Sequence, residues 1–217
     1  MPRQRGRQNR SIKPVLHIYC EGEKTEPNYL NAYLDDFHSG KRTLKVIKIT
    51  DTKKNTPKQL VDEAIKKKKS HDTPSSDEFW VVYDREAVNK YSNDLHAQSL
   101  LKANANEINV AFSNVCFEVW ILLHLTTSVA PYSSCDDLLS NSPLKSKFKE
   151  RGVNHYSKAD SSIYDVISKD VHIARARAKK MNTATLSAAT QGKDAPYLLN
   201  PYTNVYELLD AIDAFVK

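Results

Sequence analysis

Four short apolar runs, each ending at polar residues, are the first pattern along the chain. They cover residues 15–20, 44–49, 79–83 and 108–112. Near-continuous hydrophobic runs of this length are typical of buried parallel strands, whose two faces are covered by other elements. We therefore expect these four runs to be strands of one sheet.

The stretches between these runs have the spacing of helices. Thr25 is a candidate N-cap with Pro27 in the first turn of the helix that follows, and Thr56-Pro57 opens a second helix. A third helix is expected over residues 92–104. Strands and helices therefore alternate, which predicts an α/β fold with a mostly parallel sheet flanked by helices.

Beyond the fourth run the alternation stops and a helical C-terminal elaboration is expected. A short apolar helix covers residues 117–125, and a loop-rich stretch follows it. Further helices are predicted near residues 143–150, over residues 161–181, and from an N-cap at Thr203 to Phe215.

Composition bounds the domain organisation. The chain has 217 residues, of which 40% are hydrophobic, enough for a real core. We expect a disordered basic arm over residues 1–12, an α/β core over residues 13–130, and the helical elaboration packed on that core over residues 131–217. The three cysteines have neither zinc-site nor disulfide spacing, and no signal-peptide-like or ~20-residue apolar segment is found. A soluble cytoplasmic protein is expected.

The formal net charge of +6 favours a polyanionic partner such as nucleic acid. Basic residues gather at three places, namely Arg3, Arg5, Arg7 and Arg10 in the arm, Lys66–Lys69, and Arg175, Arg177, Lys179 and Lys180. Lys66–Lys69 closes a predicted helix, where cations complement the helix dipole without any ligand. The cluster from Arg175 to Lys180 also lies at a predicted helix end, and it is interpreted half as dipole complementarity and half as a surface for nucleic acid or another partner. The arm is as easily a solubilising tail as a phosphate contact.

Carboxylates follow two of the predicted strands. Glu21 comes directly after the first run, and Asp84 and Glu86 follow the third. In open α/β sheets ligands bind beyond the carboxyl ends of the strands, so parallel pairing would bring the three acids together. Their mutual repulsion calls for a cation, and Mg²⁺ is commonly held by one or two carboxylates plus substrate phosphates. The pattern therefore predicts a metal site at this edge of the sheet.

Four further residues near the predicted site have two interpretations each. Glu26 can be a metal ligand, or an acid that stabilises the first turn of a helix, and Glu118 raises the same question at residues 117–125. Lys24 can contact a phosphate or be solvated. His124 lies on the apolar stripe of its helix, where a hydrogen-bonded core histidine is favoured over a catalytic base.

Four motifs occur in order along nearly the whole chain. They are Glu21-Gly22-Glu23-Lys24-Thr25-Glu26-Pro27-Asn28-Tyr29, Tyr83-Asp84-Arg85-Glu86, the stretch from Phe112 to Leu125, and Asn200-Pro201-Tyr202-Thr203. Each is weak alone, but their combination and order resemble the RloB family. The chain departs from the family pattern at Val115, where proline is usual, and at Glu86, where the acidic pair usually ends in aspartate.

The resemblance implies a Toprim-like domain, an α/β fold that uses Mg²⁺ or Mn²⁺ to cut or rejoin phosphodiesters. By position, Glu21 resembles the glutamate of such domains, and Asp84 with Glu86 resembles their acidic pair. The family is associated with restriction-linked and abortive-infection loci, beside an ABC-type ATPase called RloA. The resemblance thus implies a role in phage defence and an RloA-like ATPase partner.

The leading hypothesis from the sequence is a metal-dependent phosphodiester nuclease acting on DNA or RNA. Glu21, Asp84 and Glu86 would bind one or two metal ions, and Glu26 or Glu118 would hold a second ion or orient water. Basic surfaces would hold the nucleic-acid backbone. The alternative is a non-catalytic Toprim-like subunit that binds nucleic acid or the ATPase. A phosphotransferase or phosphohydrolase acting on nucleotides is disfavoured because the chain has no Gly-x-x-x-x-Gly-Lys-Ser/Thr loop. The oligomeric state stays open.

Overall fold

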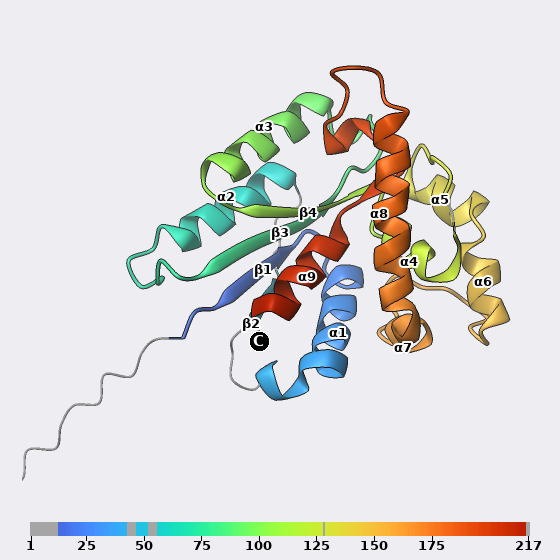
Figure 1. Ribbon diagram of the computed structural model, residues 1–217, viewed down its shortest axis with the longest axis horizontal. Helices are drawn as coiled ribbons and strands as arrows, with labels where there is room; N and C mark the ends of the chain where they lie inside the picture. Colours follow the sequence, from blue (N-terminus) through green and yellow to red (C-terminus); the bar gives the residue numbers. More distant parts are fainter. Residues whose placement is uncertain (1–12, 43–46, 52–55, 128, 216–217) are drawn as a thin grey trace, which may run out of the picture.

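One open sheet of four parallel strands and a short antiparallel fifth organises the protein (Figure 1). The computed structural model describes residues 13–42, 47–51, 56–127 and 129–215. The strand order is β2-β1-β3-β4-β5. The strands are β1 (Leu16–Cys20), β2 (Ile47–Asp51), β3 (Glu78–Asp84), β4 (Asn109–Asn114) and β5 (Tyr202–Thr203). This confirms the predicted α/β fold with a mostly parallel sheet. The predicted arm with Arg3, Arg5, Arg7 and Arg10 lies outside the described residues.

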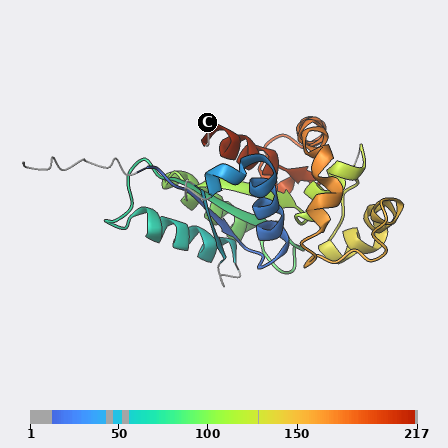
Figure 2. The same ribbon diagram turned by 90° about the horizontal axis from the view of Figure 1, so that it is seen from below.

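Helices cover both faces of the sheet and gather beyond its carboxyl edge (Figures 1 and 2). Helices α2 and α3 pack on one face, whereas α1 and α9 pack on the other, and α4 to α8 lie beyond the carboxyl ends of the strands. The helices are α1 (Thr25–Arg42), α2 (Pro57–Lys68), α3 (Asn93–Ala105), α4 (Glu118–Leu125), α5 (Cys135–Asn141), α6 (Leu144–Glu150), α7 (Ile163–Ile167), α8 (Val171–Ser187) and α9 (Val205–Phe215), with short 3₁₀ turns η1 (Ser168–Asp170) and η2 (Pro196–Leu198).

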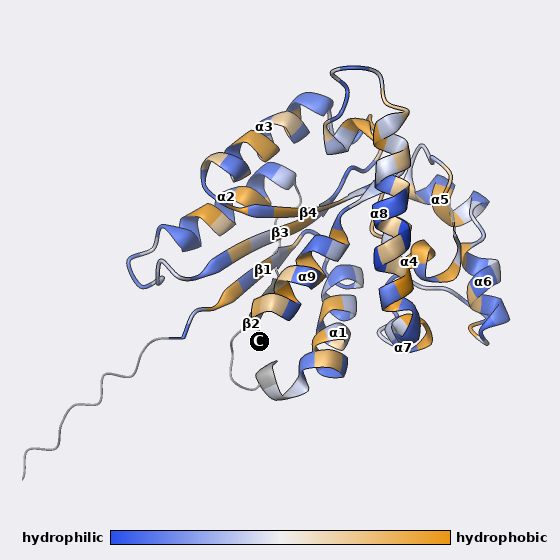
Figure 3. Cartoon of the chain, viewed as in Figure 1, coloured by the Kyte–Doolittle hydropathy of each residue, from blue (hydrophilic) through white to orange (hydrophobic). Residues whose placement is uncertain are grey.

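Alternating side chains of the strands feed two separate hydrophobic cores. In β3, Trp80 and Val82 join the core under α1, α4 and α9, whereas Phe79 and Val81 join the core under α2 and α3. Helices α2 and α3 carry both hydrophobic and hydrophilic residues, as expected for helices with one buried side (Figure 3). The first core extends from Leu16 in β1 to residues of α9, so the C-terminal helices share a core with the first strand.

Several boundaries differ from the expectation. The helix expected over residues 161–181 is α7, η1 and α8, and α8 continues to Ser187. Arg175 and Arg177 therefore lie in mid-helix, and complementing the dipole of a helix end is the wrong explanation for them. Thr203 belongs to β5 and stands one residue before the N-cap position of α9. Its hydroxyl lies 2.9 Å from that of Ser113 and also accepts from the N–H of Val205, the first residue of α9, at 3.5 Å. Helix α5 and strand β5 were not expected. Strand β5 has only two residues, which are too few to show a periodic pattern.

None of the helices in the described part of the chain combines the length and apolar character needed to cross a lipid bilayer.

Helix α9 should be an integral part of the fold. Leu208 is fully buried in the core shared with β1, so Leu208→Ala should lower the free energy of unfolding by about 2–5 kcal/mol. The matched control Leu101→Ala removes a leucine that is 70% exposed on α3, and should change it by no more than about 0.5 kcal/mol. Urea unfolding followed by circular dichroism measures both, and equal effects would contradict the shared core.

Candidate functional site

The pairing of β1 with β3 sets the geometry of the predicted acidic site. Cys20 pairs with Val82, and the Glu21 N–H that follows donates to the Val82 carbonyl at 2.9 Å. The Asp84 backbone N–H in turn donates to Oε2 of Glu21 at 3.2 Å. Parallel pairing therefore brings together the two carboxylates that stand 63 residues apart in the sequence. The two motifs predicted that Glu21, Asp84 and Glu86 would meet at this edge, and the pairing brings the first two together.

Glu26 reaches the same place from the first turn of α1. Its side chain is buried, and its carboxylate lies against Gly22. A Cβ atom at position 22 would collide with Oε2 of Glu26, so the glycine permits this close approach. The sequence allowed two interpretations of Glu26, a metal ligand or an acid that stabilises the first turn of a helix. Its position at the start of α1 and in the groove fits both.

The acids line an open groove of about 520 Å³ beyond the carboxyl ends of β1 and β3. Glu86 lies on its rim rather than beside Asp84, because its φ of +57° turns the chain out of the extended conformation. Its carboxylate pairs with Lys90 Nζ at 2.9 Å. The lining residues are Glu21, Gly22, Glu23, Lys24, Thr25, Glu26, Asp84, Glu86, Lys90, Tyr91, Lys158 and Ala159.

Burial and mutual repulsion disfavour the charged forms of these acids. Burial, helped by the charge of Glu86, raises the pKa of Glu21 to about 7, although hydrogen bonds from Asp84 and Tyr91 oppose it. Burial and the charges of Glu118 and Glu21 raise the pKa of Glu26 to about 7. Burial, followed by the charges of Glu26 and Glu21, raises the pKa of Asp84 well above its usual value. Protons or a cation would relieve this repulsion.

The donor set fits a hard divalent cation. Oδ1 of Asp84 is buried and has no hydrogen-bond partner among the described residues. Buried polar oxygens are normally satisfied, so this one calls for a partner such as a proton or an ion. Carboxylate oxygens are the ligands that Mg²⁺ and Mn²⁺ prefer. Glu21, Glu26 and Asp84 offer ligands of this kind, although their carboxylate oxygens do not all lie within 4.8 Å of one another, so binding one ion would require these side chains to draw closer together.

Glu118 and His124 of α4 occupy different surroundings. Glu118 is fully buried, and its carboxylate meets Lys158 Nζ at 3.1 Å and the Tyr156 hydroxyl at 3.2 Å. It does not line the groove, but its charge contributes to the raised pKa of Asp84.

His124 lies in the core rather than in the groove. Its Nδ1 is 3.0 Å from the Trp120 carbonyl, so Nδ1 donates and Nε2 accepts from the Tyr29 hydroxyl, also at 3.0 Å. Burial lowers the pKa of His124 to about 4. Both ring nitrogens are thus accounted for by packing, as in the core histidine that the sequence favoured.

Three groove residues were not anticipated from the sequence. Tyr91 donates its hydroxyl to Oε1 of Glu21 at 3.0 Å, and its carbonyl is held by the buried Arg85 guanidinium at 2.7 Å. Lys90 pairs with Glu86. Lys158 arrives on a loop that the Thr25 hydroxyl holds by donating to the Lys158 carbonyl at 2.9 Å. No motif marks Lys158, because a loop lysine carries no periodic signal.

The basic residues of α8 make contacts within the fold. Arg175 pairs with Asp210 at 2.6 Å and with Asp213 at 2.8 Å. Arg177 donates to the Leu123 carbonyl at 2.8 Å. Lys179 pairs with Asp210 at 3.4 Å, and Lys180 is exposed. Most of the charge predicted to meet nucleic acid here is thus engaged inside the protein, whereas Lys24 is exposed at the groove.

Comparison with known proteins identifies a family to which the chain is similar. The model of a family described as RloB-like protein matches residues 16–212. The matched range begins at β1 and ends in α9, and it contains every groove residue named above. No curated protein and no solved structure matches the chain.

The raised pKa of Glu26 predicts a change in how stability depends on pH. Between pH 4.5 and about 7 the folded state keeps a proton on Glu26 that the unfolded chain has lost, so stability falls as pH rises through this window. Glu26→Gln cannot lose that proton. In EDTA at pH 8 the variant should be more stable than wild type by about 1–3 kcal/mol, and the difference should vanish below about pH 5.

Urea unfolding between pH 5 and pH 8 measures this difference. Glu23→Gln is the matched control, because it removes an exposed carboxylate from the same loop. Parallel pH profiles for wild type and Glu26→Gln would contradict the buried acidic cluster.

Proposed function

We propose that this chain, which belongs to the RloB-like family, is a metal-dependent phosphodiester nuclease. The observation that carries the proposal is the convergence of Glu21, Glu26 and Asp84 in an open groove at the carboxyl edge of a parallel sheet. Ligands of open α/β sheets bind at this edge. Acids with disfavoured charges, together with a buried unpartnered oxygen on Asp84, suit a site that works with a bound cation.

The groove residues divide into metal ligands and supports. Asp84 and Glu21 would hold Mg²⁺ or Mn²⁺, with Glu26 beside them, and Tyr91 keeps the Glu21 carboxylate oriented through its hydroxyl. Bound there, the ion would polarise a phosphoryl group and lower the pKa of an attacking water. Glu86 is paired with Lys90 at the rim, so it serves as a ligand only if that pair opens.

The charges around the groove favour a phosphate ester as the substrate. Lys24, Lys90 and Lys158 line it together with the acids, so cations surround the carboxylates. Lys24 is exposed and free to approach a phosphate, and Lys158 is drawn inward by Glu118. A nucleic-acid backbone can thus be held by lysines at the rim while one phosphate meets the acidic centre. The proposal includes both DNA and RNA as candidate substrates.

We further propose, from the resemblance to RloB proteins, that an RloA-like ABC-type ATPase controls this activity in an abortive-infection or phage-defence system. Control by a partner would protect the host from an unregulated nuclease. Activity should therefore be measured with and without an ATPase encoded beside this chain.

Cleavage of labelled DNA and cellular RNA tests the activity. Wild type should cut one of them in Mg²⁺ or Mn²⁺ and not in EDTA. Asp84→Asn keeps the size of the side chain but removes a charged ligand, so it should slow cleavage by roughly a hundredfold or more. The control Asp94→Asn, which neutralises an exposed acid on α3, should cut like wild type.

Two results would count against the nuclease. One is equal cleavage by Asp84→Asn and wild type, which would place the activity elsewhere or in a contaminant. The other is no cleavage in any condition by folded protein with its ATPase bound, which would favour the non-catalytic binding subunit.

Lys24 provides a separate test of nucleic-acid binding. Lys24→Ala should weaken binding and reduce the slope of log affinity against log salt by about one, because one phosphate contact is lost. Lys66→Ala removes the same charge from the exposed end of α2, outside the groove lining, and should leave the slope unchanged. Fluorescence anisotropy across a salt series measures both, and equal slopes for the two variants would remove Lys24 from the interface.

A further inference from the structure

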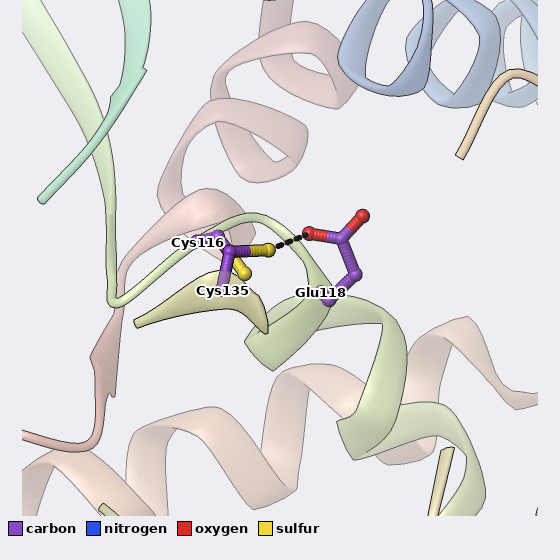
Figure 4. A group of neighbouring side chains, drawn as sticks. All are labelled: Cys116, Glu118 and Cys135. Carbon is purple, nitrogen blue, oxygen red and sulfur yellow. Dashed lines mark hydrogen bonds between the residues drawn. The ribbon is translucent and has the colours of Figure 1, made fainter. Parts of the chain in front are cut away.

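We propose that Cys116, Glu118 and Cys135 form a second metal site, distinct from the acidic groove, for a thiophilic divalent cation such as Zn²⁺. The two thiols and one carboxylate oxygen all lie within 4.8 Å of one another, from three points on the chain (Figure 4). Cys116 precedes α4, Glu118 opens it, and Cys135 opens α5. No zinc-site spacing is visible in the sequence, because the third ligand lies 17 residues beyond the second.

The geometry is close to what a tetrahedral ion requires. With bonds of about 2.3 Å to sulfur and about 2.1 Å to oxygen, tetrahedral angles separate a sulfur and an oxygen ligand by roughly 3.6 Å. Cys135 Sγ lies 3.3 Å from Oε2 of Glu118. Small side-chain rotations therefore suffice, and the fourth position remains for water or another ligand.

The donor set selects the kind of metal. Thiolate ligands favour Zn²⁺ and similar soft or borderline ions over Mg²⁺. Glu118 is fully buried, as is Cys116, so this cluster is more enclosed than the groove. The groove, in contrast, is lined by carboxylates and contains no thiol. We therefore expect the thiol-containing site to bind Zn²⁺ and the groove to bind Mg²⁺ or Mn²⁺.

The charge of the cluster balances when the ion is bound. Two thiolates and one carboxylate carry three negative charges, and a divalent ion neutralises two of them. The Lys158 ammonium, 3.1 Å from Oε2 of Glu118, neutralises the third. Buried charges are tolerated when they are paired in this way.

The shared oxygen links this site to the groove. Oε2 of Glu118 accepts hydrogen bonds from both Cys135 and Lys158, and Lys158 also lines the groove. A metal bound to Oε2 would share the Glu118 carboxylate with the Lys158 ammonium, so the position of Lys158 couples this site to the groove.

Titration of Co²⁺ into the full-length, reduced and EDTA-treated protein tests the site. Thiolate ligands give Co²⁺ an ultraviolet charge-transfer band that carboxylates do not, so the groove contributes nothing to this signal. With excess Mg²⁺ to occupy carboxylate sites, the band should saturate at one Co²⁺ per chain and bleach when Zn²⁺ is added. The measurement needs no nucleic acid, so it is independent of the proposed nuclease activity.

Variants identify the ligands. Cys116→Ser and Cys135→Ser should each abolish the band or shift its saturation to at least about tenfold higher Co²⁺, and Glu118→Gln should weaken binding similarly. Cys20→Ala removes the remaining cysteine and should leave the titration unchanged. Cys135 is only half-buried, so its variant should fold, which the circular dichroism spectrum checks.

Other outcomes overturn the proposal. No band in the reduced wild type, or an undiminished band in folded Cys135→Ser, would exclude this ligand set. A Cys116–Cys135 disulfide that forms on adding a peroxide, with no Co²⁺ band in the reduced protein, would instead identify the pair as a simple thiol couple.

Discussion

The parallel pairing of β1 with β3 is the constraint on which the rest of the site depends. It fixes Cys20 opposite Val82, so the residues that leave the two strands, Glu21 and Asp84, meet at the same edge. A slip of one residue would exchange every side chain between the two cores, since Trp80 and Val82 belong to one and Phe79 and Val81 to the other. Register is thus enforced by the full burial of both faces, and the unfavourable meeting of two carboxylates is held in place by hydrophobic packing.

Polar contacts behind the groove position the side chains that repel one another there. Arg85 is buried next to Asp84, yet its guanidinium turns to the Tyr91 and Tyr197 carbonyls and to the Asn93 side chain. Tyr91 then donates to Glu21, so the arginine acts on the site through the loop it organises. The first turn of α1 holds the Lys158 loop through the hydrogen bond from Thr25 to the Lys158 carbonyl. The site is therefore built from separate parts of the chain, of which the Tyr91 and Lys158 segments are each held through a backbone carbonyl.

Sequence patterns were informative where burial imposes a period. The strand ends predicted the meeting of Glu21 and Asp84, and the apolar stripe of α4 predicted a core position for His124. Sequence patterns did not predict features that depend on a few contacts between residues far apart in the chain. The loop that carries Lys158 is held at the groove by the side chains of Thr25 and Asn28, which are 133 and 131 residues from the carbonyls they bond, and β5 is two residues long. Arg175 lies inside α8 rather than at its end because no stop signal interrupts the helix before Ser187, and its acidic partners Asp210 and Asp213 lie in another helix.

The late position of β5 in the chain has a consequence for protein synthesis. Its residues Tyr202 and Thr203 pair with β4, and the neighbouring Asn204 holds the Val110 carbonyl and the Phe112 N–H. While the ribosome is still adding these residues, the edge of the sheet stays open and α9 is missing from the core that contains Leu16. The ribosome therefore adds more than a hundred residues between the acidic motifs and the strand and helix that complete the sheet and its core. Any activity of the groove is thereby delayed until these residues have been translated, and a product terminated before them would contain the acids without the fold that brings them together.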